Sequence, residues 1–295
     1  MIHISSVFDK NYLALAIALV DSIKRTYGED FEFHCLCLDD ESLKVIGENF
    51  PQAITYKCSE LEDEELRSAK KDRPYNEYCW TLASWFSNYL LTRLEMPHII
   101  YIDADIWFVD DSKDFFKECL DKSVGIMRHR HIPPGHPDGG YNVGVVSFRN
   151  DKVGIRTLSW WKDAVLKKEP RDLATCGDQK FLEAFPNIAK TENIKILDEN
   201  FSYGAPWTYR LYGWSNFFNT GKVLWGDKEQ PLVFVHFSRI GINTETKEVT
   251  NVTDPQFSVH TLNDGVFSIP EVAWLYYQYR DTVLKIIQDY KLYAK

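Results

Sequence analysis

The chain has 295 residues, of which 44% are hydrophobic and 26% charged, with 12 prolines and 15 glycines. This composition is that of an ordinary globular protein, and it excludes a disordered, collagenous or repeat-dominated chain. The formal net charge of −9 excludes a protein that holds nucleic acid mainly by counterion release. Aromatic residues make up 15% of the chain, which fits a large aromatic core and a sugar-binding surface equally well.

The cysteines indicate a reducing compartment. There are six, and none forms a C-x-x-C pair that would suggest a zinc site or a redox motif. The apolar stretch at 12–20 is too short to span a bilayer and lacks the basic flank of a secretory signal. We therefore predict a cytoplasmic protein without a transmembrane segment.

Strands and helices are predicted to alternate at short spacing in the first part of the chain. The hydrophobic pattern predicts strands at 2–8, 31–38 and 53–58, separated by helices at 12–27 and 42–49. This alternation is typical of a parallel sheet that is covered by helices.

The alternation of predicted strands and helices is less regular further along the chain. A long helix is predicted at 77–94, before the strand at 98–102, whose apolar neighbours indicate a central place in the sheet. The remaining predicted elements are a strand at 141–148, a helix at 151–168, a short helix at 177–185, a strand at 232–237 and a last helix at 271–293. We expect ordered loops at 198–231 and a polar, mobile loop at 241–265.

Asp103 and Asp105 directly follow the predicted strand at 98–102. Residues two apart in an extended chain point to the same side, and open α/β sheets bind ligands at the carboxyl ends of their strands. Two carboxylates there suit Mg²⁺ or Mn²⁺, with positions left open for phosphate oxygens. The alternative is a pair of exposed acids that cap the next turn. Two adjacent buried acids would repel without a cation, which favours the metal.

Three further features combine polar residues with regular structure. Asn142 and a glycine interrupt the strongly β sequence at 141–148, which indicates either close approach of a ligand or a bulge. Asp178 opens a predicted helix and could simply cap it. His236 ends an apolar strand and is followed by Arg239, so the two could serve a metal and a phosphate, or His236 could be an ordinary hydrogen-bonding histidine.

Taken in order, these features resemble a known family. The segments are Asp9-Lys10-Asn11-Tyr12, Tyr101-Ile102-Asp103-Ala104-Asp105, Tyr141-Asn142-Val143-Gly144-Val145, Gly177-Asp178-Gln179 and Val235-His236-Phe237. The series is similar to the GT-A-fold nucleotide-sugar glycosyltransferases of family eight, and especially to a bacterial branch associated with capsule and surface-polysaccharide synthesis. The resemblance covers about residues 1–240. It implies an α/β, Rossmann-like GT-A fold with a mixed, mostly parallel central sheet flanked by helices, and a C-terminal helix.

The resemblance also implies roles for individual residues. Val7, Asp9 and Asn11 match positions that hold the base and ribose of the donor. The metal-binding positions match Asp103, Asp105 and His236, and Asp103 also lies near the ribose. Asn142 matches a residue that lines the donor sugar, and Asp178 and Gln179 match the pair beside the anomeric carbon. The family often has a lysine after the metal-binding histidine, and we expect Arg239 to replace it as the phosphate contact.

The function implied is a hexosyltransferase of polysaccharide biosynthesis that uses a UDP-sugar, Mn²⁺ or Mg²⁺, and a hydroxyl of a glycan or lipid-linked acceptor. We expect one GT-A domain over 1–295, with a nucleotide-binding half at 1–110, an acceptor and catalytic half at 111–240, and a loop and C-terminal helix at 241–295. A retaining reaction is favoured because the amide of Gln179 cannot act as a base. Asp178 could, so an inverting reaction stays open.

Two other functions deserve comparison. A sugar- or nucleotide-binding protein of the same fold without activity is disfavoured by the intact Asp103, Asp105, Asp178 and His236. A haloacid-dehalogenase-like phosphohydrolase also has D-x-D after an apolar strand, but usually near the N-terminus and with Thr or Val two residues later, whereas Ile106-Trp107 follows here.

Two segments can each be interpreted in two ways. The loop at 129–136 contains three histidines and two prolines, and Pro137 follows it, so it is either a surface loop that the prolines keep open or an acceptor or phosphate wall. The tyrosine-rich last helix could make weak peripheral contact with a membrane near lipid-linked acceptors, but the acidic chain favours packing on the sheet.

Overall fold

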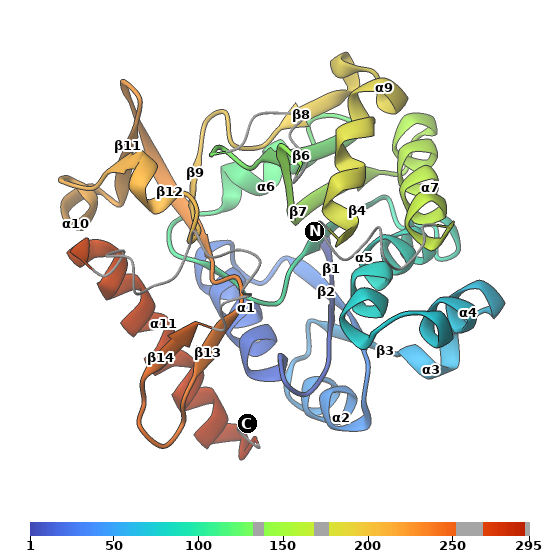
Figure 1. The fold of residues 1–295 in the computed structure, drawn as a ribbon, viewed down its shortest axis with the longest axis horizontal. Coiled ribbons are helices and arrows are strands. Elements are labelled where there is room, and N and C mark those ends of the chain that lie inside the picture. The colour runs from blue at the N-terminus through green and yellow to red at the C-terminus, as the bar shows by residue number, and fades with distance from the viewer. Residues whose placement is uncertain (132–138, 168–176, 252–267, 293–295) are drawn as a thin grey trace. The chain divides into compact units, whose positions relative to one another are not determined.

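The computed structural model describes residues 1–131, 139–167, 177–251 and 268–292 (Figure 1). The chain forms two compact units. The first comprises Met1–Lys10, Glu29–Asp103 and Asp114–Leu197, and the second comprises Asn11–Gly28, Ala104–Lys113 and Asp198–Lys295. The predicted single domain and its boundaries stay a prediction.

A seven-stranded mixed sheet forms the centre of the first unit. Its strands are β1 (Ile2–Phe8), β2 (Phe31–Cys37), β3 (Ala53–Lys57), β4 (His98–Ile102), β6 (Val124–Arg128), β7 (Tyr141–Arg149) and β8 (Ile194–Ile196). The order is β3-β2-β1-β4-β7-β6-β8. The first four strands in this order are parallel, β7 is antiparallel to both of its neighbours, and β8 is parallel to β6. The predicted α/β sheet, with β4 in its middle, is confirmed.

Helices cover this sheet within the first unit. They are α2 (Asp40–Asn49), α3 (Cys58–Leu61), α4 (Glu64–Asp72), α5 (Tyr75–Thr92), α6 (Lys113–Cys119), α7 (Lys152–Lys167), η1 (Gly177–Ala184), α9 (Phe185–Ala189) and η2 (Thr191–Asn193). Helices α5 and α7 pack against each other, α5 on β1 and β4 and α7 on β6 and β7 (Figure 1). Phe86, Phe148 and Trp161 are fully buried in the core between these helices and the sheet. Burial of this apolar face is the main driving force for the layer.

The second unit is built around one strand of nine residues that pairs with three others. Its strands are β5 (Ile106–Phe108), β9 (Ser202–Gly204), β10 (Tyr212–Gly213), β11 (Lys222–Trp225), β12 (Lys228–His236), β13 (Ile240–Ile242) and β14 (Val249–Asn251). Its helices are α1 (Leu13–Thr26), η3 (Tyr209–Leu211), α10 (Phe217–Thr220) and α11 (Pro270–Tyr290). Strand β12 pairs antiparallel with β5 and β11 and parallel with β9. Helix α1 packs on β5 and on α11.

Two predicted loops of the second unit need correction. Residues 198–231 were expected as loops, but they contain β9, β10, β11 and the first residues of β12. Strands of two to four residues are too short to show a hydrophobic period of two, and they form by pairing with β12, directly for β9 and β11 and through β11 for β10. Within 241–265, β13 and β14 form an antiparallel pair, and residues 252–265 lie outside the described part of the chain.

The predicted C-terminal helix is confirmed as α11. It begins with Pro270 in its first turn, where a missing N–H is tolerated. Tyr276 and Tyr279 are buried, and the ring of Tyr279 stacks on Phe237 with centroids 4.0 Å apart. Every helix in the described residues is too short or too polar to span a bilayer. Weak peripheral contact with a membrane stays a prediction.

Candidate functional site

In the first unit, two acidic residues follow neighbouring parallel strands. Strands β1 and β4 pair at Ser5 and Tyr101, so Asp9 and Asp103 leave the sheet at the same edge. Each carboxylate accepts a hydrogen bond from a tyrosine. Tyr75 Oη donates to Asp9 Oδ2 at 2.8 Å, and Tyr101 Oη donates to Asp103 Oδ1 at 2.8 Å. Both carboxylates are thus held in fixed orientations.

A chain of hydrogen bonds connects Asp103 to Gln179. The backbone N–H of Asp103 donates to the carbonyl of Gly144 on β7 at 2.9 Å. The N–H of Gly144 donates to Oδ1 of Asn142 at 3.0 Å, and Nδ2 of Asn142 donates to Oε1 of Gln179 at 3.1 Å. The polar residues that interrupt this strand therefore orient one another. The close approach of a ligand to the glycine stays a prediction.

Asp178 is the buried acid of this cluster. Burial raises the pKa of its carboxyl well above the usual range, and the nearby charge of Asp103 raises it further, while backbone N–H groups at 178 and 179 act in the opposite direction. The backbone carbonyl of Asp178 accepts a hydrogen bond from Trp161 Nε1 at 3.2 Å. The site thus favours the neutral carboxyl at this position.

Gly177 sets the turn that precedes this acid. Its φ of +58° lies in the left-handed region, and a Cβ there would lie 3.2 Å from the ring of Trp80. A glycine is therefore required both by the backbone and by the neighbouring indole. Asp178 does open a helix as predicted, but the helix is the 3₁₀ helix η1.

In the second unit, Asp105 and His236 contact each other. Strand β5 pairs with β12 so that Ile106 lies opposite His236, and the N–H of Phe237 donates to the carbonyl of Asp105 at 2.9 Å. Asp105 Oδ1 lies 3.2 Å from His236 Nε2, and both side chains are nearly buried. A carboxylate and an imidazole are thus held side by side.

This pair has the chemistry and spacing of divalent-metal ligands. Mn²⁺ and Mg²⁺ bind oxygen and nitrogen ligands at about 2.1 Å, so adjacent ligands of an octahedral ion lie about 3 Å apart. The 3.2 Å between Asp105 Oδ1 and His236 Nε2 fits that spacing. The two residues can therefore hold such an ion.

Aromatic residues to which the sequence assigned no role at a metal site lie beside this pair. The ring of Trp207 lies edge-on to His236 with centroids 5.5 Å apart, and its Nε1 donates to Tyr203 Oη at 3.2 Å. Burial and the charge of Asp105 raise the pKa of Tyr279. The spacing of buried tyrosines along α11 was the available signal, but it indicates only which face of the helix is buried.

The other predicted residues are distributed over the two units. Val7 lies half-buried on β1 in the first unit, whereas Asn11 and Arg239 are exposed residues of the second. Arg239 has a φ of +60°, which is uncommon for a residue with a side chain. The chain passes from the first unit to the second directly after Asp103.

The predicted histidine loop is described only in part. His129 is buried, and its Nδ1 lies 3.2 Å from the carbonyl of Gly139. Its ring also meets that of His131 edge to face, with centroids 4.9 Å apart. Residues 132–136 lie outside the described part of the chain, and the role of the loop as an acceptor wall stays a prediction.

Comparison with known proteins identifies the family. Residues 3–247 match the sequence model of the family described as "Glycosyl transferase family 8". YfnF of Bacillus subtilis (strain 168), an uncharacterised protein, is 30% identical over 279 residues, which cover 87% of this chain and 88% of YfnF.

Solved structures show the same fold. The galactosyltransferase LgtC, in complex with donor and acceptor sugar analogues, is 13% identical, with a TM-score of 0.56 and coverage of 93% of this chain and 96% of LgtC. Mouse xyloside xylosyltransferase 1 is 18% identical, with a TM-score of 0.50 and coverage of 80% of this chain and 97% of the mouse protein. The predicted GT-A fold is confirmed, and nothing supports the phosphohydrolase alternative. The chain belongs to glycosyl transferase family 8 and is a glycosyltransferase.

Proposed function

We propose that this glycosyltransferase moves a hexosyl group from a UDP-sugar to a hydroxyl of a glycan or lipid-linked acceptor, in polysaccharide biosynthesis, with Mn²⁺ or Mg²⁺ and with retention of the anomeric configuration. The observation that carries the proposal is the 3.2 Å contact between Asp105 and His236. The pair would supply two metal ligands, and Asp105 lies two residues after Asp103 in the chain.

Asp103 is the third proposed metal ligand. The chain itself keeps it near Asp105, because Cα atoms two residues apart are separated by at most about 7 Å. One carboxylate from each Asp and the imidazole of His236 form a donor set that suits Mn²⁺ and leaves positions for the donor's phosphates. When bound, the ion supplies a Lewis acid that offsets the negative charge on the departing diphosphate.

The nucleotide is assigned to the residues at the carboxyl end of β1. Val7, Asp9 and Asn11 are proposed to hold the base and ribose. The hydrogen bond from Tyr75 to Asp9 supports this assignment, because it fixes the carboxylate at the edge of the sheet where ligands bind. Asp103 would also contact the ribose from the neighbouring strand.

Arg239 is assigned to the diphosphate. It is exposed, and its left-handed backbone conformation costs stability in any residue with a Cβ. Such conformations are concentrated at ligand-binding positions. A guanidinium can also donate two parallel hydrogen bonds to phosphate oxygens.

The donor sugar is assigned to Asn142, Asp178 and Gln179. Inversion needs an ionised base on the acceptor hydroxyl. Gln179 cannot ionise, and burial favours the neutral form of Asp178 because it raises the pKa of that carboxyl. We therefore assign retention: the bond from the sugar to the diphosphate breaks, the acceptor oxygen bonds to the same face, and a diphosphate oxygen takes the acceptor's proton.

Calorimetry tests the metal and nucleotide assignments together. UDP is titrated into the chelator-treated protein with and without Mn²⁺, and the titration is repeated with Asp105→Ala. We expect binding that depends on Mn²⁺ in the wild type and is lost in the variant. Binding of equal affinity in both proteins would contradict the metal assignment.

Product analysis tests the reaction. A screen of nucleotide-sugars by thermal stabilisation identifies the donor, and NMR of the purified product gives the anomer. We expect the anomer of the donor to be retained. An inverted anomer would assign Asp178 as the base and overturn the retaining course.

A further inference from the structure

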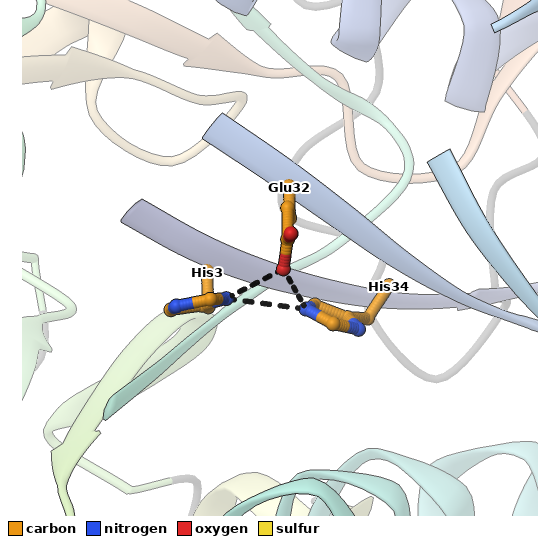
Figure 2. A group of neighbouring side chains, drawn as sticks. All are labelled: His3, Glu32 and His34. Atoms are coloured by element: carbon orange, nitrogen blue, oxygen red, sulfur yellow. Dashed lines mark hydrogen bonds and ion pairs between the residues drawn. The ribbon is translucent and has the colours of Figure 1, made fainter. Parts of the chain in front are cut away.

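A second group of metal-ligand side chains lies in the first unit, at the amino ends of β1 and β2. His3 lies on β1, and Glu32 and His34 lie on β2. His3 is paired with Glu32 in the parallel register, so their side chains share a face of the sheet, and His34 follows two residues later on that face. Figure 2 shows the three side chains pointing toward one another.

The three ligand atoms form a nearly equilateral triangle. His3 Nδ1 lies 3.0 Å from Glu32 Oε2, His34 Nε2 lies 3.5 Å from the same oxygen, and the two nitrogens are 3.4 Å apart (Figure 2). Zinc binds nitrogen and carboxylate oxygen at about 2.0–2.2 Å, so ligands of a tetrahedral zinc lie about 3.3–3.6 Å apart. The triangle therefore matches one face of such a tetrahedron to within a few tenths of an ångström.

Hydrogen bonds account for only part of this convergence. Glu32 Oε2 could accept a proton from each imidazole, but two N–H groups that both point at this oxygen would then face each other across the 3.4 Å between the nitrogens, whereas a metal ion contacts all three atoms through their lone pairs. His34 Nδ1 lies 3.1 Å from Tyr56 Oη. When this N–H donates to the hydroxyl, the lone pair of His34 Nε2 faces Glu32, which is the orientation that outer partners impose on metal-bound histidines.

The surroundings of the cluster allow a bound ion to be exchanged. His3 and His34 are buried, while the side chain of Glu32 is 31% exposed and gives a path from solvent. Two neutral imidazoles and one carboxylate would leave a bound divalent ion with one net positive charge. Water that enters beside Glu32 can take the fourth position.

We propose that His3, Glu32 and His34 form a Zn²⁺ site that ties β1 to β2. The ligand set of two histidines and one glutamate is one that zinc prefers, and Mg²⁺, which prefers oxygen, would bind it poorly. The site is separate from Asp103. The backbone N–H of His3 donates to His98 Nε2 at 3.2 Å at the start of β4, and Asp103 follows the other end of that strand, about 16 Å away.

Cobalt spectroscopy tests the site without a measurement of activity. The tag-free, chelator-treated full chain is titrated with Co²⁺, whose visible absorption is intense when it is four-coordinate, and Zn²⁺ is then added to displace it. We expect this absorption in the wild type and in Asp105→Asn, which leaves the cluster intact. We expect it to be lost in Glu32→Gln.

Calorimetry with Zn²⁺ gives the affinity. Mutation of residues that only hydrogen-bond to metal ligands lowers metal affinity about 10- to 100-fold. Loss of Glu32, which is itself a proposed ligand, should therefore lower the affinity for Zn²⁺ roughly 100-fold or more. Glu48→Gln, at an exposed acid of α2, is the matched control and should bind as the wild type does. His3→Gln serves as a second variant if Glu32→Gln does not fold. Absence of the cobalt absorption in the wild type, or its retention in Glu32→Gln, would overturn the proposal.

Discussion

Asp105 Oδ1 and His236 Nε2 lie 3.2 Å apart, although the two residues are far apart in the sequence. Their contact depends on the pairing of β5 with β12, in which Ile106 lies opposite His236. The short strand β5 thus brings the carboxylate of the residue that precedes it to the imidazole of the last residue of β12.

Asp105→Asn keeps the shape of the side chain and removes its charge. Because the proposed ion would lose an anionic ligand, we expect turnover to fall roughly 100-fold or more, or about 3 kcal/mol. The measurement is kcat at saturating Mn²⁺. Asp111→Asn is the control, because Asp111 is exposed and accepts a hydrogen bond from the N–H of Lys113 that an asparagine can also accept. Equal loss in both variants would contradict the specific role of Asp105.

Asp178→Asn should raise the free energy of unfolding above that of the wild type, and the difference should grow as the pH rises. The pKa of this carboxyl is raised in the folded protein above the ordinary value of 3.8. Above that value the unfolded chain loses the proton while the folded chain keeps it, so the wild type loses stability with rising pH. The variant has no such group, so its advantage should be larger at about pH 8 than at about pH 4. Urea unfolding of both proteins checks this, and an advantage independent of pH would contradict it.

Gly177→Ala should destabilise the protein and reduce its turnover. The left-handed φ of +58° costs about 1–2 kcal/mol for alanine, and the added Cβ would lie 3.2 Å from Trp80. Displacement of the turn would move Asp178 and Gln179. In contrast, Gly47→Ala in α2 adds a Cβ 3.5 Å from Thr55 and should stabilise by about 0.5–1 kcal/mol. Thermal unfolding and kcat are measured for both variants. A shift of the unfolding temperature in the same direction in both would refute this account.

Arg239→Gly should separate stability from donor binding. Glycine relieves the left-handed backbone at φ +60°, which should stabilise the protein by about 1 kcal/mol, whereas loss of the guanidinium should raise KM for the donor roughly tenfold. Lys247→Gly, at φ +59°, is the matched control and should gain stability with unchanged KM. An unchanged KM for Arg239→Gly would remove this residue from the phosphate site.

The sequence predicted well the elements that carry a long, regular hydrophobic pattern. Strands β1, β2, β4 and β7 and helices α1, α5, α7 and α11 were expected within a few residues of their bounds. In contrast, β9, β10 and β11 were taken for loops. Each of these strands forms by pairing with β12, directly or through β11. They were missed because two to four residues are too few to show a hydrophobic period.

The sequence by itself determined the order of chemical groups along the chain: an acid after β1, a D-x-D after β4, an asparagine in β7, an acid and amide in η1 and a histidine at the end of β12. Only the tertiary structure decided which of these groups meet. It placed Asp105 against His236, buried Asp178 so that its pKa rises, and brought His3, Glu32 and His34 to within 3.5 Å of one another. The physical reason is that local periodicity reports which face of an element is buried, whereas strand register and packing between distant segments set the distances between functional atoms.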